Sequence, residues 1–293
     1  MGHATHAAST DQYYVPHGSK WPAVGTIGLF TTMLGASTAL SEHSFGPYVM
    51  FAGIAIIVFM LFGWFGDVVR ESVKGMYNGQ VDVSFRMGMV WFIFSEVMFF
   101  AAFFGALFYA RAFSVPWIGG EGDGFATNQL LHAGYEAAWP TNGPGNIGGR
   151  FETIPAWGIP LLNTLLLLTS GLTITIAHHA LRAGRRKSLL FWLGATVVLG
   201  AVFLYYQVHE YAEAYGHLNL TLGSGVYGST FFMLTGFHGM HVTLGAIMLT
   251  VIWFRIARGH FSRDNHFAFE AVAWYWHFVD VVWLGLFVFV YVI

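Results

Sequence analysis

Long apolar runs, separated by short polar segments, dominate the pattern of hydrophobic and polar positions along the chain. A helix needs about 20 mostly apolar residues to cross the hydrocarbon core of a bilayer. The candidate spans are residues 21–40, 46–66, 85–112, 156–178, 188–209, 225–256 and 267–293. The first is the least apolar because it is rich in Gly and Thr. Two others, 85–112 and 225–256, exceed one perpendicular crossing, which implies tilt or extension beyond the bilayer.

The same pattern argues against a membrane β-barrel. The apolar runs are far longer than the roughly 10 residues of a barrel strand, and they lack apolar–polar alternation at period two. We therefore predict an all-α, polytopic membrane protein with seven transmembrane helices.

Composition supports this class and excludes several others. The chain is 56% hydrophobic and only 10% charged, whereas soluble proteins carry about 25% charged residues. Lipid must therefore be part of its solvent. A formal net charge of -2 argues against a nucleic-acid partner, which favours clustered basic residues. The absence of cysteine excludes disulfides, Cys-ligated zinc, iron–sulfur clusters and thiol catalysis.

The distribution of basic residues predicts the orientation. With seven spans and the N-terminus inside, only Arg111 and Arg150 lie outside. The positive-inside rule then favours a cytoplasmic N-terminus and an external C-terminus. The remaining basic residues, on the cytoplasmic side, are Lys20, Arg70, Lys74, Arg86, Arg182, Arg185, Arg186, Lys187, Arg255, Arg258 and Arg263.

The longest external segment, residues 113–155, is rich in Gly and carries several acidic residues. It has few helix or strand signals, so we expect it to be irregular. It could serve as a solvated connector or as a docking surface for another subunit or a basic partner.

Five ionisable side chains lie deep within the apolar runs. Glu96 follows the cytoplasmic Arg86 by ten residues, which at about 1.5 Å per residue places it about 15 Å deep, near the middle of the bilayer. His277 and Asp280 lie at comparable depth and share one helical face at a separation of three. His238 and His241 form a second pair of the same spacing. Each such group is costly in hydrocarbon and should face protein, water or a partner.

Three functions are compatible with these residues. Haem binding would pair His238 or His241 with His277 across a porphyrin, although the neighbouring glycines and histidines could equally serve helix packing. Proton-coupled transport would use Glu96 and Asp280 as carriers, but no inverted repeat is evident.

The third possibility is a non-catalytic helical subunit that holds lipid headgroups. Arg70 and Arg255, the latter with His260, end their spans on the cytoplasmic side, where basic residues bind phospholipid phosphates. No P-loop and no Gly-x-Ser-x-Gly motif is present. This argues against a P-loop nucleotide-binding enzyme and against an α/β-hydrolase.

Several long segments, taken in order, resemble subunit III of the haem–copper cytochrome c oxidases. They are GWFGDVVRES, MVWFIFSEVMFFAAFF, IPLLNTLLLLTSG, YYQVHEYAEA, GVYGSTFFMLTGFHGMHV and HFAFEAVAWYWHFVDVVWLGLFVFVY. The resemblance covers nearly the whole chain beyond about residue 20 and is far more specific than a short motif.

The resemblance implies an arrangement of the helices. A cytoplasmic tail (1–20) would precede a two-helix bundle (21–66) and a five-helix bundle (67–293) that includes the external segment 113–155. A V-shaped cleft between the two bundles would hold phospholipids.

The resemblance also implies a function without catalysis. The chain would pack mainly against subunit I, with subunit II in the same complex, while haem and copper reside in those partners. It would stabilise subunit I and support proton uptake in a respiratory complex that oxidises ferrocytochrome c and reduces oxygen. Cytochrome c would be met only through the complex, and this chain would bind structural phospholipids but no metal, haem or nucleic acid.

Individual residues acquire roles by the same resemblance. Arg70 and Arg255 would contact lipid phosphates, with His260 and Trp64 belonging to the same lipid-binding set. Glu96 matches the family's carbodiimide-reactive intramembrane glutamate. His238, His241, His277 and Asp280 would be further intramembrane polar groups, and no residue would be catalytic.

The implied location is a bacterial inner membrane and the implied enzyme an aa3-type oxidase, with the C-terminus in the periplasm. A subunit of a related quinol oxidase or nitric oxide reductase complex is the nearest alternative.

Overall fold

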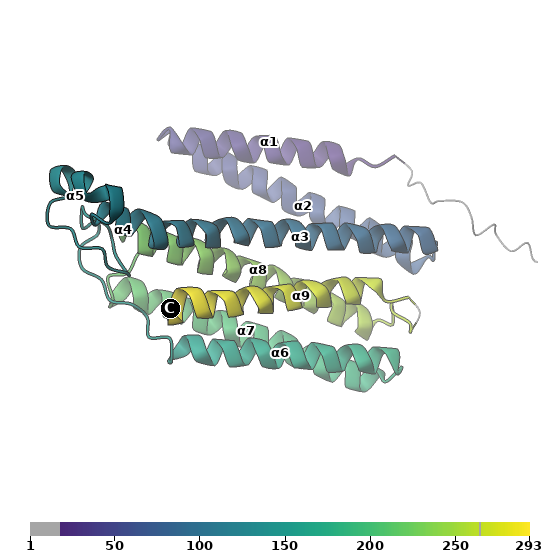
Figure 1. Cartoon of the computed structure of the whole chain (residues 1–293). Helices are drawn as coiled ribbons and strands as arrows, with labels where there is room; N and C mark the ends of the chain where they lie inside the picture. The colour runs from purple at the N-terminus through teal and green to yellow at the C-terminus, as the bar shows by residue number, and fades with distance from the viewer. Residues whose placement is uncertain (1–17, 264) are drawn as a thin grey trace, which may run out of the picture. The chain divides into compact units, whose positions relative to one another are not determined.

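The computed structural model describes residues 18–263 and 265–293. The predicted tail 1–20 therefore lies outside the described residues except for its last three positions. Within the described part of the chain all regular structure is helical, and seven helices are long and apolar enough to cross a membrane (Figure 1). The prediction of an all-α protein with seven candidate transmembrane helices is confirmed.

The long helices match the predicted spans in order but are mostly longer at their polar ends. Apolarity marks only the part of a helix inside hydrocarbon, and the backbone continues its hydrogen bonding beyond it. The helices are α1 (Trp21–Leu40), α2 (Gly46–Val73), α3 (Gly79–Tyr109), α6 (Ile159–Arg182), α7 (Arg186–Gly216), α8 (Gly225–Ala257) and α9 (Phe267–Leu286). A π-helical turn, Phe287–Val292, extends α9.

The segment after α3 is more ordered than the sequence predicts. A π-helical turn (Ala110–Ser114) leads into α4 (Val115–Ile118), a 3-10 turn (Gly122–Gly124) and α5 (Phe125–Leu131). The Asn128 side-chain amide donates to the carbonyls of Ile118 and Tyr135, each at 3.0 Å. These bonds connect the end of α4 to the segment that follows α5. Such side-chain-to-backbone bonds order a glycine-rich segment without an apolar period, which is why the pattern did not predict them.

The described helices form two units, one ending at Met87 and the other comprising Gly88–Ile293. In the first unit α1 packs closely along α2. A Cβ added at Gly35 would overlap the backbone of Met50, and one at Gly53 would overlap Thr32. Small residues at such positions let transmembrane helices approach closely. Close packing matters because no hydrophobic effect drives helices together within lipid.

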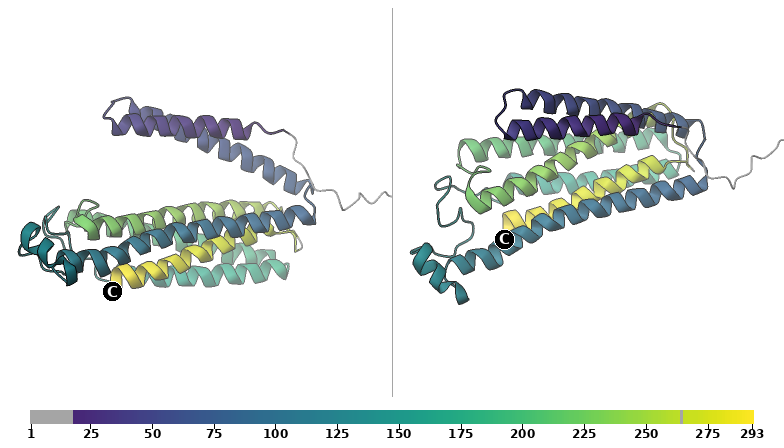
Figure 2. Two further views of the ribbon diagram at one scale, coloured as in Figure 1. Left: turned by 45° about the horizontal axis from the view of Figure 1, so that its top comes forward. Right: turned by 90° about the horizontal axis from the view of Figure 1, so that it is seen from above.

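In the second unit α6, α7, α8 and α9 form a closed bundle, each packed against its neighbour and α9 back against α6 (Figure 2). The second-unit part of α3 lies along this bundle through aromatic contacts. The Phe99 and Phe237 rings are 4.9 Å apart, edge to face, and those of Phe100 and Phe278 are 6.1 Å apart.

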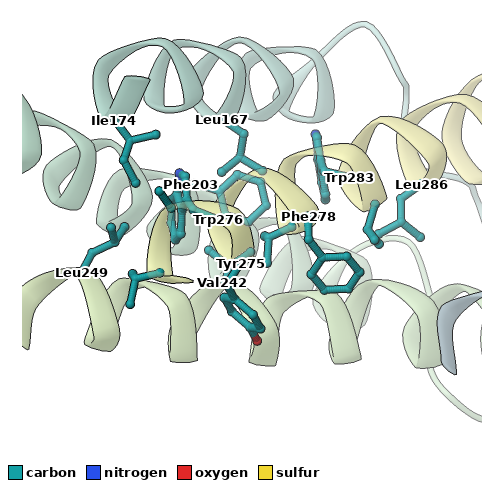
Figure 3. Close-up of a cluster of buried hydrophobic side chains, with 14 of the residues drawn as sticks. Leu167, Ile174, Phe203, Val242, Leu249, Tyr275, Trp276, Phe278, Trp283 and Leu286 are labelled. Carbon is teal, nitrogen blue, oxygen red and sulfur yellow. The ribbon is translucent and has the colours of Figure 1, made fainter. Parts of the chain in front are cut away.

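Two tryptophans of α9 occupy the centre of this bundle (Figure 3). The indole N–H of Trp276 donates to Ser170 Oγ and that of Trp283 to Thr164 Oγ1, each at 2.9 Å. Both are fully buried, and both acceptors lie on α6. These bonds offset the cost of removing each indole N–H from water.

Glycines on two other helices make room for Trp276. A Cβ at Gly200 of α7 would lie 2.7 Å from its ring, and a Cβ at Gly245 of α8 would lie 2.8 Å from it. The bundle therefore closes around one large side chain whose neighbours are glycines on both sides.

Helices α6 and α8 end in the same way and at the same end of the unit. Gly184 and Gly259 follow them with φ of 70° and 80°, the left-handed conformation that closes a helix C-terminus. Arg263 donates to the Ala183 carbonyl at 3.0 Å. Arg186 likewise donates to the Ala257 carbonyl at 2.7 Å. These two side chains satisfy backbone carbonyls that the helix ends leave open.

Candidate functional site

The intramembrane carboxylate Glu96 lies against a histidine of another helix. Its Oε2 atom is 2.9 Å from Nε2 of His241, which joins α3 to α8. The other ring nitrogen, Nδ1, donates to the Phe237 carbonyl at 2.6 Å. Because a carbonyl only accepts, Nδ1 carries a hydrogen, and Nε2 is the atom that shares a proton with Glu96.

The pair is formally neutral wherever that proton lies. A neutral carboxyl beside a neutral imidazole and a carboxylate beside an imidazolium both sum to zero. This lowers the cost of placing two ionisable groups in an apolar span. The side chain of His241 is almost fully buried, whereas that of Glu96 retains 23% exposure.

Aromatic rings enclose the Glu96–His241 pair. The ring of Phe100 lies edge-on to His241 at 5.1 Å, and that of Tyr275 stacks on it at 6.3 Å. The rings limit the space around the imidazole, whose Nε2 lies against Glu96.

His238 is engaged separately, although it shares α8 with His241. Its ring is fully buried, and Nε2 donates to the Val279 carbonyl of α9 at 3.1 Å. The indole of Trp283 lies 5.1 Å away and the ring of Phe203 5.8 Å away. His238 therefore ties α8 to α9.

These contacts do not fit axial ligation of a haem. The Nε2 atoms of His238 and His241 already have protein partners, the Val279 carbonyl and Glu96. Close aromatic packing on the rings occupies the space that a porphyrin would need. Binding a haem between His277 and either of these histidines would require displacement of that histidine's hydrogen bond and of the surrounding side chains.

His277 and Asp280 lie together at the surface of the bundle, one turn apart on α9. The distance from His277 Nδ1 to Asp280 Oδ2 is 3.7 Å, and Thr175 of α6 approaches Nε2 of the same histidine at 3.5 Å. The side chain of His277 is 45% exposed and that of Asp280 only 9%. Neither residue contacts the Glu96–His241 pair through a hydrogen bond in the described part of the chain.

The predicted lipid-binding residues of the first unit lie near the end of α2. The Arg70 side chain is 73% exposed and pairs with Asp67, whose carboxylate also accepts from the Trp21 indole at 2.6 Å. Trp64 is half-exposed and stacks on Phe65. Asp67 thus links α2 to α1 through Trp21 and also forms an ion pair with Arg70.

The predicted lipid-binding residues of the second unit lie where α8 ends. The guanidinium of Arg255 stacks over Phe261 at 4.5 Å. Its Nε atom and the Nδ1 atom of His260 are buried and lack a hydrogen-bond partner among the described residues. Two such nitrogens, five residues apart where α8 ends, can donate to a phosphate.

Sequence reasoning missed one buried carboxylate. Glu210 of α7 accepts from the Tyr291 hydroxyl at 2.6 Å, and its side chain lies inside the bundle. Gln207 and Ala214 are buried on the same face of α7. The spacing 207, 210, 214 is that of one helix face, and this pattern would have predicted that Glu210 is buried.

One group among the described residues has a geometry that could hold a metal ion. A potential ligand atom of His178, His266 and Glu270 lies within 4.8 Å of each of the others. The Glu270 carboxylate is 3.5 Å from His178 Nε2 and 3.2 Å from His266 Nε2. Both Nε2 atoms lie within ion-pair distance of the carboxylate but make no hydrogen bond to it in the described part of the chain.

These features define a class of protein: a polytopic helical membrane subunit whose mid-span polar groups largely bond to one another and to backbone carbonyls. The comparisons with known proteins then identify the family. The chain matches the family model of cytochrome c oxidase subunit III over residues 11–123 and 132–293.

Individual relatives agree over nearly their whole length. Cytochrome c oxidase subunit 3 of Marchantia polymorpha is 41% identical over 274 residues, 93% of each chain. That of Arabidopsis thaliana is 40% identical over 280 residues, 95% of each chain. That of Dugong dugon is 39% identical over 292 residues, 99% of this chain and 98% of the relative.

The chain belongs to the cytochrome c oxidase subunit III family. It is a multi-pass, non-catalytic member of an oxidase complex that also contains subunits I and II.

Proposed function

We propose that the chain stabilises subunit I as its main contact, retains phospholipid and supports proton uptake by the complex. The observation that carries this proposal is the pairing of deep polar groups. Glu96 bonds to His241, and His238 bonds to the Val279 carbonyl. A transport site needs polar groups that converge on a space for the solute, whereas Glu96 and His241 bond to each other and His238 bonds to a backbone carbonyl.

In this proposal Glu96 keeps its proton and donates it to His241 as a tie between helices. The hydrogen on Nδ1, which the Phe237 carbonyl accepts, supports an acceptor role for Nε2. A neutral hydrogen bond here fastens α3 to α8 without a net charge in the apolar span.

Phospholipid retention is assigned to Arg255 with His260, and separately to Arg70 with Trp64. The buried, unpartnered nitrogens of Arg255 and His260 support a phosphate contact. The exposure of Arg70 supports another, since its guanidinium pairs with Asp67 through one nitrogen and retains further donors.

Haem and copper are assigned to the partner subunits, and cytochrome c is met only through them. We assign the chain to a bacterial inner membrane and an aa3-type oxidase, with the N-terminus cytoplasmic and the C-terminus periplasmic. The basic residues at the α6–α7 and α8–α9 connections, including Arg185 and Arg258, support this orientation. The long segment 113–155 is the feature that supports the bacterial type.

A tagged chain tests the proposal through what it retains after mild detergent extraction. Subunits I and II should co-purify in stoichiometric amounts with haem and copper. The separated chain should show no Soret absorption and, in liposomes, no proton flux. A stoichiometric b-haem spectrum of the separated chain would overturn the proposal.

A double variant tests the lipid assignment. Arg70→Ala with Arg255→Ala should lower the phosphorus content of the purified complex and speed loss of activity during turnover. Arg258→Ala is the matched control, because Arg258 is an exposed basic residue at the end of the same helix as Arg255. Unchanged phosphorus content in the double variant would contradict the assignment.

A further inference from the structure

The surface between α6 and α9 carries a polar cluster where the helices are otherwise apolar. We call it the α6–α9 seam and define it by Thr175, His277 and Asp280. His277 follows the start of α9 by ten residues, which corresponds to a depth of about 15 Å. The seam therefore lies near the middle of a hydrocarbon core about 30 Å thick.

Asp280 is the least satisfied group of the seam. Its Oδ1 atom is buried and has no hydrogen-bond partner among the described residues. Its Oδ2 atom lies beside Gly171 of α6, where an added Cβ would be only 2.6 Å away. The glycine lets the carboxylate lie against the backbone of α6, close to the surface of the bundle.

The neighbouring groups satisfy this carboxylate only in part. His277 Nδ1 is 3.7 Å from Oδ2, beyond hydrogen-bond length. The Thr175 hydroxyl is already a donor to the Gly171 carbonyl at 2.8 Å. A half-exposed imidazole therefore lies at the surface beside a carboxylate whose side chain is 9% exposed.

Covering the polar groups of the seam with lipid tails would have a large free-energy cost. Ionisable groups in transmembrane helices face protein or water-filled cavities, and an unpaired polar group in lipid costs several kcal/mol. The side chains around the seam are apolar and exposed, with Leu172 at 61% and Val281 at 67%. The body that covers the seam must therefore be apolar overall and bring at least one hydrogen-bond donor at mid-span.

We propose that the α6–α9 seam is the docking face for a transmembrane helix of subunit I. That helix would carry a hydroxyl, amide or basic side chain that hydrogen-bonds to His277 and reaches the accessible edge of the Asp280 carboxylate. The inference rests on the proposed function, in which subunit I is the main neighbour. It adds the face of this chain that makes the contact and the chemistry of the partner side chain.

The surface of α7 offers a contrast within the same unit. Val198 is 61% exposed and lies twelve residues from the start of α7, a depth close to that of Val281 on α9. Phe191 is also exposed on α7. This part of α7 suits lipid, since apolar side chains need no polar partner.

Photo-crosslinking in native membranes tests the docking face. Val281 and Val198 would each be replaced, in separate experiments, by p-benzoylphenylalanine. After irradiation, the Val281 position should crosslink to subunit I, and the Val198 position should not. Crosslinks from Val281 only to lipid or to a second copy of this chain, or crosslinks to subunit I only from Val198, would overturn the proposal.

Two variants of Asp280 test the hydrogen bond itself. Asp280→Leu should lower the recovery of subunit I with the tagged chain about threefold to tenfold, whereas Asp280→Asn, which can still accept a hydrogen bond, should retain most of it. The membrane abundance of the chain is measured in parallel. If Asp280 is needed only for folding, its replacement by Leu lowers that abundance in step with recovery, and this result would refute the docking role.

The control is the unaltered chain. If it brings down no haem-containing subunit, the proposed function fails. If the unaltered chain does bring down a haem-containing subunit but the Val281 position does not crosslink to subunit I, the proposed function stands and only the docking face is wrong.

Discussion

Nε2 of His241 lies 2.9 Å from Oε2 of Glu96, so a polar contact joins α8 to α3 within the apolar spans. The backbone of α3 approaches the other helices of its unit less closely than they approach one another. The attachment of α3 therefore depends on side chains, and among them Glu96 supplies a polar contact with α8 through His241.

We predict that Glu96→Gln leaves oxygen reduction by the complex largely intact. The Gln amide can still donate to His241, and the chain is non-catalytic. Glu96→Leu should instead lower the stability of the complex by about 0.5–2 kcal/mol, because it leaves His241 without its partner. Oxygen uptake and thermal inactivation measure the two effects. Ser95→Ala is the control, since that hydroxyl donates within its own helix, to the Phe92 carbonyl. Abolished turnover in an assembled Glu96→Gln complex would refute the prediction.

The packing around Trp276 makes a prediction about one glycine. Gly245→Ala should destabilise the bundle by about 1–3 kcal/mol, because the new methyl group would lie 2.8 Å from the buried indole ring and overpack the core. Gly239→Ala in the same helix should have little effect, since no atom lies within 4 Å of its added Cβ. Thermal unfolding of the two purified complexes compares them directly, and equal midpoints would show that the core yields to the methyl group.

A second prediction about close packing concerns α1 and α2. Gly35→Leu should separate the two helices, because even a Cβ at Gly35 overlaps the backbone of Met50. Gly66→Leu on α2 is the control, since its Cβ would meet no atom within 4 Å. Limited proteolysis of residues 41–45, which connect the helices, should be faster in the Gly35 variant alone. Equal cleavage rates in the two variants would show that the glycine is dispensable.

The buried pair of Glu210 and Tyr291 predicts an effect of one hydroxyl. Tyr291→Phe removes the donor to Glu210 Oε1 and leaves a buried carboxyl group unpaired, which should cost about 1–3 kcal/mol of stability. Tyr205→Phe is the control, because that side chain is exposed. Thermal unfolding of the complex provides the measurement. Adding Glu210→Leu to Tyr291→Phe should recover part of the loss, and a still larger loss in the double variant would point to another role for Glu210.

Much of the architecture follows from the sequence because each long apolar run is a local property. Twenty consecutive apolar residues specify a membrane helix wherever they occur, and the structure places a long helix at each predicted span. The one-turn spacing of His277 and Asp280 likewise gives them a common face without reference to the rest of the chain. The ordered turns around Asn128 were not predictable in this way, since its carbonyl partners are chosen by the path of the folded segment.

What the sequence by itself determined is the number of spans, their order and the depth of each polar group along its own helix. Only the tertiary structure decided which groups meet. His238 and His241 are three residues apart, so their side chains diverge by roughly 60° around α8. That angle directs His238 to the Val279 carbonyl of α9 and His241 to Glu96 of α3. The partners are set by the rotation and packing of whole helices, and Glu96 lies 145 residues from His241, a separation over which no local pattern carries information.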